Sequence, residues 1–396
     1  MQSDLEPGAP PSAGLIPLSV PNLSEIEWRY VRDCLDTAWI SSVGDYVTRF
    51  EEDVARAVDA QYAVAMSSGT AALHIALKLA GVRSGDEVVL PSLTFVAPAN
   101  AVRYLNAFPV FVDVDPDCWQ LSPDELACFL SADCEPADDG IRNRHTGRRI
   151  AAVVPVDLLG HPCDLDVIHE IARRFELSVV EDAAESLGAQ YRGAPVGGIS
   201  SLTALSFNGN KIVTTGGGGV LATADRELAD RARYLSTQAK DDPFEYVHNE
   251  VGYNYRLTNV QAAIGCAQLE RLSEFVERKR EIARRYTEEL GLIPGVTPAR
   301  EAPWARSTFW LYTALVDPEL FGRTSRELAE SLRAEGIQAR PLWQPLHRSP
   351  AHRESFACAC PVADRLNRDA ISLPCSTGLE EAAQDVVIRA IRRAAR

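Results

Sequence analysis

The feature that most restricts the fold of this chain is a regular alternation of short apolar segments with helical ones between residues 63 and 222. Segments between the apolar runs, such as the alanine- and leucine-rich 71–80 and the amphipathic 165–175, predict helices. Continuous apolar strands that alternate with helices imply a mainly parallel sheet covered on both faces. We therefore expect an α/β fold whose ligands bind at the carboxyl ends of the strands. The strands are predicted at 63–66, 87–90, 109–114, 150–156, 178–180, 202–207 and 220–222.

Polar residues stand at two of these strand ends. Ser67-Ser68-Gly69-Thr70 follows the first strand and opens a helix, so its free amides and small hydroxyl groups suit a phosphate. The same residues would also serve as an ordinary helix cap. Asp182 closes a later strand, with a helix N-cap as its alternative role. If both act as ligand groups, they meet at one edge of the sheet.

Lys211 lies in a polar, glycine-rich loop between the strands 202–207 and 220–222. A structural lysine usually occupies a solvated helix face. A lysine fixed in a tight loop beside a sheet is a candidate nucleophilic amine, because desolvation lowers its pKa toward neutrality. The alternative is a surface hairpin with a solvated lysine and flexible glycines.

Composition excludes several classes of protein. The net charge of −15 and the pI near 5.0 argue against binding to nucleic acid or to a membrane surface. No apolar segment at the N-terminus is long enough for a signal or a membrane span, so we expect a cytoplasmic protein. The nine cysteines have no paired CxxC spacing and predict reduced thiols without a metal site.

We expect three parts in the chain. Residues 1–23 form an N-terminal arm, 24–255 a large α/β domain, and 256–396 a small α+β domain. A capping box at Ser24 to Glu27 begins the first helix of the large domain. The polar segment 133–149 lacks periodicity and predicts a surface loop, and 258–290 predicts one long helical connector.

The motifs, taken in order, resemble the fold-type I enzymes that use pyridoxal 5'-phosphate (PLP), and in particular the nucleotide-sugar aminotransferase family. The resemblance covers the chain from about Ile16 to the C-terminal helix. It is specific, because five separate motifs follow in the right order. They are Ser67-Ser68-Gly69-Thr70-Ala71-Ala72-Leu73, Pro91-Ser92-Leu93-Thr94-Phe95, Glu181-Asp182-Ala183-Ala184-Glu185, Ser206-Phe207-Asn208-Gly209-Asn210-Lys211 and Gly252-Tyr253-Asn254-Tyr255-Arg256-Leu257-Thr258-Asn259.

The resemblance implies a role for each matched residue. Lys211 would be the Schiff-base lysine and the base that moves the substrate proton, and Asp182 would pair with the pyridine nitrogen. Glu185 would lie near the phenolic oxygen of the cofactor, and Phe95 would stack on its ring. Residues that hold the cofactor, mainly at its phosphate, would be Ser68, Gly69, Thr70, Ser206 and Asn208.

Further roles reach beyond one subunit and beyond the cofactor. Asn254 resembles an asparagine that contacts the cofactor phosphate of the neighbouring subunit, which implies a homodimer. Arg256 would help to bind the carboxylate of the donor, for which a guanidinium group is suited, although a structural salt bridge is an open alternative. In the segment Arg340 to His347, the residues Arg340, Trp343 and His347 would line the sugar pocket, with a core tryptophan and a solvated histidine as the alternatives.

Two departures from the common family pattern concern the acceptor. Many members have histidine where this chain has Asn208, and glutamate where it has Gly217. The sequence Asn-Gly-Asn-Lys and the run of four glycines resemble the branch that acts on UDP-linked 4-keto-6-deoxy sugars. We therefore expect amino transfer from L-glutamate to UDP-4-keto-6-deoxy-N-acetylglucosamine, with a GDP- or dTDP-linked keto sugar as the alternative acceptor.

Two other classes of protein share this fold. Related sugar dehydratases replace the lysine with histidine, which Lys211 argues against. A regulatory relative without catalysis would be expected to lose Asp182 or Lys211, and both are present.

Overall fold

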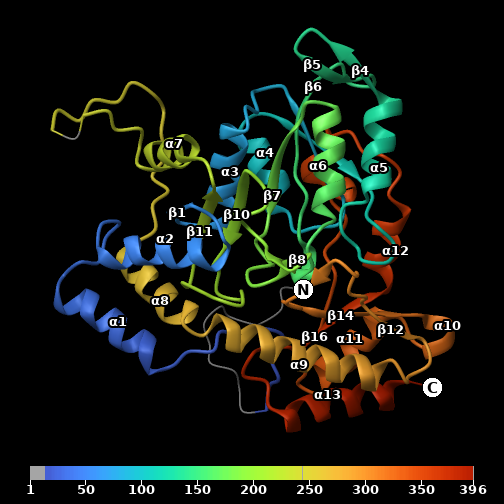
Figure 1. Cartoon of the computed structure of the whole chain (residues 1–396). Helices are drawn as coiled ribbons and strands as arrows, with labels where there is room; N and C mark the ends of the chain where they lie inside the picture. Colours follow the sequence, from blue (N-terminus) through green and yellow to red (C-terminus); the bar gives the residue numbers. More distant parts are fainter. Residues whose placement is uncertain (1–13, 243, 396) are drawn as a thin grey trace.

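The computed structural model describes residues 14–242 and 244–395, and its centre is a mixed, mainly parallel sheet (Figure 1). Within this sheet β11 is antiparallel to both of its neighbours, whereas the pairs from β10 to β3 are parallel. The α/β fold predicted from the alternation is confirmed. In spatial order the strands are β1 (Tyr62–Met66), β11 (Gly219–Thr223), β10 (Leu202–Ser206), β7 (Ser178–Asp182), β6 (Arg149–Val153), β2 (Glu87–Pro91) and β3 (Phe108–Val112).

Helices cover both faces of this sheet. Successive residues of a buried strand point to opposite faces, so each strand contributes side chains to two apolar cores. Val64 and Met66 of β1 join an apolar core with α3 (Gly69–Leu79), α4 (Ala97–Tyr104) and α7 (Arg226–Ser236). Ala63 and Ala65 of the same strand face the other core. That core contains side chains of α2 (Asp45–Ala57), α5 (Pro123–Cys128) and α6 (Leu165–Arg174).

A second, antiparallel sheet is built from residues after 295. Its order is β12 (Val296–Pro298), β14 (Tyr312–Val316), β16 (Ala370–Leu373) and β15 (Arg340–Pro341). Helices α9 (Leu272–Leu290), α11 (Ser325–Ala334) and α13 (Glu381–Ala394) pack on it and on each other (Figure 1). Two further helices of this part are α10 (Pro318–Phe321) and α12 (Pro361–Asp369). A separate small sheet has the order β13 (Ala305–Arg306), β8 (Gln190–Tyr191) and β9 (Ala194–Pro195).

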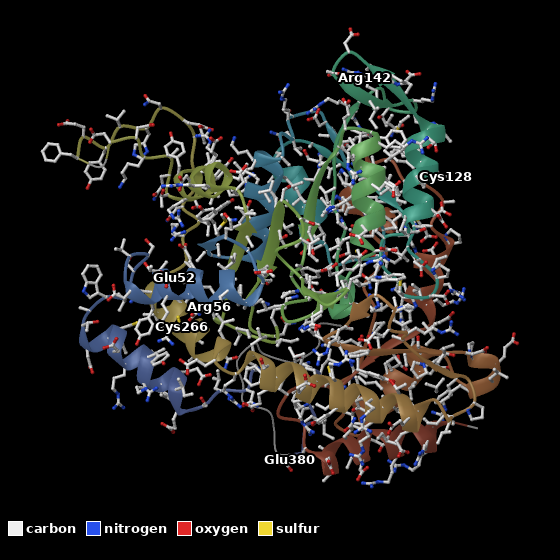
Figure 2. All side chains as sticks on the ribbon, in the orientation of Figure 1. Glu52, Arg56, Cys128, Arg142, Cys266 and Glu380 are labelled. Carbon is white, nitrogen blue, oxygen red and sulfur yellow. The ribbon has the colours of Figure 1, made fainter. Side chains whose placement is uncertain are left out.

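The segment 133–149 is not a loop, and this prediction was wrong. It contains a hairpin of β4 (Cys134–Ala137) and β5 (Gly140–Asn143), which pairs with β6 at the edge of the central sheet. Figure 2 shows Arg142 on this hairpin, where its guanidinium donates to the Asp139 carboxylate at 3.0 and 3.1 Å. The strands are too short and too polar to show periodicity, so pairing with β6 decides their structure.

Two boundaries also differ from expectation. The connector 258–290 is two helices, α8 (Asn259–Leu269) and α9, because α8 packs on α1 (Glu25–Asp36) and α2 while α9 packs on the second sheet. The apolar segment 309–316 also predicts a strand, which begins only at Tyr312. The capping box from Ser24 to Glu27 is present at α1 as predicted.

Residues 1–13 of the expected N-terminal arm lie outside the described residues. The rest of the arm packs against the C-terminal part of the chain, where the Ile16 amide donates to the Gly336 carbonyl at 2.9 Å and the Val20 amide donates to the Ser376 hydroxyl at 3.0 Å. The division of the chain at residue 255 remains a prediction.

Candidate active site

A cavity of about 450 Å³ opens at the carboxyl ends of β1, β7 and β10. This is the edge at which a ligand site is expected in an open α/β sheet. The cavity brings together most of the residues singled out in the sequence. Those that line it are Ser68, Gly69, Thr70, Phe95, Asp182, Glu185, Ser206, Asn208, Lys211 and Trp343.

The start of α3 forms one end of this cavity. Ser68 is the N-cap, and its hydroxyl accepts a hydrogen bond from the Ala71 amide at 3.1 Å. Ser68 therefore caps the helix and also lines the cavity. A Cβ atom on Gly69 would lie 2.9 Å from Cβ of Ser206, so only glycine allows this close approach of α3 to β10. The early amides of the helix and the hydroxyl groups beside them form a cradle that suits a phosphate.

Lys211 reaches the middle of the cavity and is largely buried. Its Nζ lies 3.6 Å from Oε1 of Glu185 and 3.8 Å from the centre of the Trp310 ring. Burial lowers the pKa of Lys211 below the ordinary value for lysine, and the nearby carboxylates of Glu185 and Asp182 partly oppose that shift. A surface hairpin with a solvated lysine is thereby excluded.

The loop that carries Lys211 is closed by tight backbone contacts. The Lys211 amide donates to the Asn208 carbonyl at 3.0 Å. A Cβ atom on Gly219 would collide with the backbone of Ser68, so glycine is required there. A Cβ atom on Gly217 would meet only Nε2 of Gln261, at 3.8 Å, and Gly217 lines the cavity.

Two buried carboxyl groups, those of Asp182 and Glu185, lie near the amine of Lys211. Burial raises the pKa of Asp182 to about 7, although a hydrogen bond from the Ala184 amide at 3.1 Å lowers it. Burial also raises the pKa of Glu185, whose Oε2 accepts a hydrogen bond from the Leu159 amide at 2.7 Å. A carboxyl group with a pKa near neutrality becomes ionised when a cation is placed beside it.

Aromatic rings form the remaining wall of the cavity. Trp310 and Trp343 lie nearly parallel, with centroids 6.3 Å apart and planes inclined by 6°. Phe95 meets Trp343 edge to face at 6.2 Å. Trp310 was missed in the sequence, because it lies inside the segment 309–316, which predicts an ordinary strand, and has no motif around it.

Four residues that were expected in the site do not line the cavity. Arg256 is paired with Glu51 at 2.8 Å and donates to the Ala65 carbonyl at 2.9 Å, which is the structural salt bridge left open as its alternative. His347 bonds to Ser92, with Nδ1 and Oγ 2.6 Å apart. Arg340 and Asn254 are exposed on the surface of the subunit.

No cluster of metal-ligating side chains occurs in residues 14–242 and 244–395, and the nine cysteines are free thiols. Across the same residues, none of the helices is both long and apolar enough to cross a membrane.

The whole sequence was then compared with known proteins. Residues 21–392 match the DegT/DnrJ/EryC1/StrS aminotransferase family. The chain belongs to this family. It is 39% identical to a GDP-perosamine synthase of Caulobacter vibrioides over 95% of this chain and 97% of the relative. It is 38% identical to a GDP-perosamine synthase of Escherichia coli O157:H7, over 91% and 93% of the two chains.

Solved structures agree with this assignment. The aminotransferase TlmJ from Streptoalloteichus hindustanus superposes with a TM-score of 0.86 at 32% identity, covering 96% of this chain and 98% of TlmJ. This member of the DegT/DnrJ/EryC1/StrS family is a PLP-dependent sugar aminotransferase. Its cavity fits PLP, because it contains a phosphate cradle, a buried carboxyl group and a buried amine within one hollow.

Proposed function

We propose that this aminotransferase moves the amino group of L-glutamate to the 4-keto carbon of a GDP-linked 4-keto-6-deoxy sugar, and that it works as a homodimer. The similarity to two GDP-perosamine synthases carries the choice of acceptor, since perosamine is a 4-amino-4,6-dideoxy sugar. That similarity supports the GDP-linked alternative better than the UDP-linked sugar expected from the sequence motifs. The Asn208 to Lys211 motif and the four glycines keep the UDP-linked sugar as the second candidate.

In this proposal each end of the cavity holds a different part of the cofactor. Gly69, Thr70 and Ser206 bind the phosphate, Asp182 pairs with the pyridine nitrogen, and Phe95 covers the ring. Bound PLP supplies an electron sink and carries the amino group between the two substrates. The protein contributes binding, orientation and proton transfer.

Lys211 holds and moves the proton in the proposed reaction. Its buried position increases the neutral fraction of the amine at Nζ, which is the form that accepts a proton. Glu185 lies close enough to orient that amine. The tryptophan wall limits the water that reaches Nζ, so the proton is returned to the substrate carbon rather than lost.

Replacement of Lys211 tests the assignment of the amine. We expect Lys211→Ala to reduce turnover by roughly a thousandfold or more, because the same amine is needed for exchange and for proton transfer. The chain has only four lysines, Lys78, Lys211, Lys240 and Lys279, so borohydride reduction of the PLP-loaded protein and peptide mapping should find the pyridoxyl group on Lys211. Lys240→Ala is the matched control, because Lys240 is exposed and lies outside the cavity, so its replacement should leave turnover unchanged. A loss of only a few-fold would contradict the assignment.

The acceptor is tested by the visible absorption of the PLP-loaded protein. Addition of L-glutamate should bleach the cofactor band, and the correct keto sugar should restore it. A panel of GDP-, UDP- and dTDP-linked 4-keto-6-deoxy sugars then identifies the acceptor. Recovery with the UDP-linked sugar alone would reject the GDP-linked proposal, and failure to bleach with L-glutamate would reject the donor.

A further inference from the structure

The aromatic wall of the cavity lies directly beside the reacting amine. The ring of Trp310 is 3.8 Å from Nζ of Lys211, and its side chain is buried, with 3% of the residue exposed. The single polar atom of this indole, Nε1, donates to the Asn210 carbonyl at 2.8 Å. Trp310 therefore offers only carbon to whatever lies against its ring.

The backbone that carries each of the two indoles is fixed by a hydrogen bond to its carbonyl group. Lys279, which is buried in α9, donates from Nζ to the Trp310 carbonyl at 2.7 Å. Asn367 of α12 donates from Nδ2 to the Trp343 carbonyl at 2.9 Å. Because the two rings also lie nearly parallel, they form one fixed surface. A wall anchored in this way is pre-organised and does not have to be ordered when a substrate binds.

The cavity also contains polar side chains, among them Thr94, Asn208 and Asn210. The hydroxyl groups of Ser68, Thr70 and Ser206 belong to the phosphate cradle, and Oε1 of Glu185 lies 3.6 Å from Nζ of Lys211. The part of a substrate that points toward the indoles thus meets no charge and no free hydrogen-bonding group of Trp310.

We propose that Trp310 and Trp343 bind the apolar C5–C6 edge of the acceptor and make the enzyme selective for 6-deoxy sugars over their 6-hydroxy analogues. This inference rests on the proposed function, because it concerns the sugar whose C4 is aminated. C6 is two bonds from C4, so a sugar whose C4 lies at Nζ of Lys211 can present C6 to the Trp310 ring, whose centre is 3.8 Å from that atom. A methyl group at C6 packs on this ring, whereas a hydroxyl group there loses its hydrogen bonds to water.

The expected selectivity is moderate, since an apolar pocket rejects an added hydroxyl group by about a hundredfold at most. We expect the wild-type enzyme to prefer the 6-deoxy sugar by roughly ten- to a hundredfold in kcat/KM. The reaction can be followed in reverse with 2-oxoglutarate, comparing GDP-perosamine with GDP-4-amino-4-deoxymannose. If the wild type uses the UDP-linked sugar instead, the corresponding UDP-linked pair is compared.

Trp343 is the better position for mutation, because Trp310 touches the reacting amine. In Trp343→Ala the ratio of the two kcat/KM values should fall to about one to threefold, since half of the apolar wall is removed. Trp343→Phe keeps an aromatic ring and should retain most of the preference. Rates of the half-reaction with L-glutamate are measured in both variants, so that a general loss caused by water entering the cavity is separated from a change in the ratio between the two sugars.

Binding gives a readout without turnover. Isothermal titration of the two amino sugars into protein loaded with pyridoxamine 5'-phosphate, which has no aldehyde for their amines to react with, should show the same preference in Kd, and Trp343→Ala should lose it. Cofactor content and thermal unfolding establish that each variant is folded, and the wild-type ratio alone already tests the inference.

Three results would overturn the inference. One is a wild-type ratio near one with both sugars aminated, and another is an unchanged ratio in Trp343→Ala. A wild type that aminates no nucleotide-linked 4-keto sugar would overturn both the inference and the proposed function, and so differs from the first two results.

Discussion

The role that a charged residue can take in this enzyme depends on the balance between its burial and the charges around it. Lys211 is the example at the centre of the site, because burial lowers the pKa of its amine while Glu185 and Asp182 raise it. Arg256 shows the opposite outcome. The guanidinium group of Arg256 is paired with Glu51 and donates to the Ala65 carbonyl, and Arg256 does not line the cavity.

We predict that Arg256→Ala affects stability rather than donor binding. Glu51 would lose its most buried partner, and the free energy of unfolding should fall by about 1–3 kcal/mol. Arg233→Ala is the matched control, since Arg233 contacts the same carboxylate at 3.1 Å but is more exposed, with an expected loss below about 1 kcal/mol. Urea unfolding measures both. A large rise in the KM for L-glutamate with unchanged stability would instead restore the role in donor binding.

His74 predicts a loss of stability in acid. It is buried among Tyr104, Tyr253 and Tyr255, and burial lowers its pKa from 6.5 to about 4. The unfolded chain therefore binds this proton first, so the stabilising contribution is complete above pH 6.5 and is lost as the pH falls toward 4.

The size of this effect is on the order of 3 kcal/mol between pH 7 and pH 4. Asp182 acts in the opposite direction, because its folded pKa is raised and protonation in acid favours the folded state. The difference between wild type and His74→Phe isolates the histidine. When the free energy of unfolding is plotted against pH, the two proteins should give parallel lines above pH 7, and the wild type should lose stability faster below pH 6.5. Lines that stay parallel over the whole range would contradict the prediction.

At the scale of elements, the sequence predicted the alternating strands and helices well because each strand is buried on both faces. Val64, Val89 and Val180 need no partner outside the pattern to be recognised as strand residues. The hairpin β4–β5 was missed, since its residues are mostly polar and its pairing depends on β6. The cavity was predicted from motifs at strand ends. Trp310 was not, because its place beside Lys211 comes from the packing of two distant segments.

Besides the backbone pairing of β5 with β6, a buried side-chain hydrogen bond attaches the hairpin to the central sheet, which gives a prediction. Asn143 donates from Nδ2 to Glu87 at 2.9 Å, both residues are fully buried, and burial raises the pKa of Glu87. We expect Asn143→Ala to cost about 1–3 kcal/mol, because Glu87 is left without this donor. Glu87→Gln should change stability by less than about 1 kcal/mol, since the neutral amide keeps an acceptor. Denaturant unfolding checks both, and equal losses would contradict the proposed direction of the bond.

At the scale of the molecule, large apolar side chains are exposed along one side. Trp28 is 69% exposed, Phe244 85% and Val251 77%. Figure 1 shows α1 and the projecting segment that follows α7 (residues 237–242 and 244–251) on this same side, away from the second sheet. Such a surface supports the proposed homodimer. Asn254 follows the projecting segment and is exposed, as a residue that reaches a partner must be.

The dimer predicts that two inactive variants restore each other. In a mixed dimer of Lys211→Ala and Asn254→Ala chains, one site would combine Lys211 of one chain with Asn254 of the other, and both would be intact. After unfolding and random reassembly, about a quarter of the wild-type turnover should return, because half of the dimers are mixed and each has one good site. Each variant refolded alone is the control. No recovery would mean that Asn254 serves its own subunit or that the chain does not dimerise.

The four glycines after Lys211 are not equally free to diverge during evolution. Gly219 is fixed by the backbone of Ser68, whereas Gly217 has open space and faces the cavity. Every glycine codon differs at one base from a codon for glutamate or aspartate, so a single mutation can place a carboxylate in the cavity without disturbing the loop. A lineage of such enzymes can therefore explore new acceptors through this one codon while the lysine and its loop are inherited unchanged.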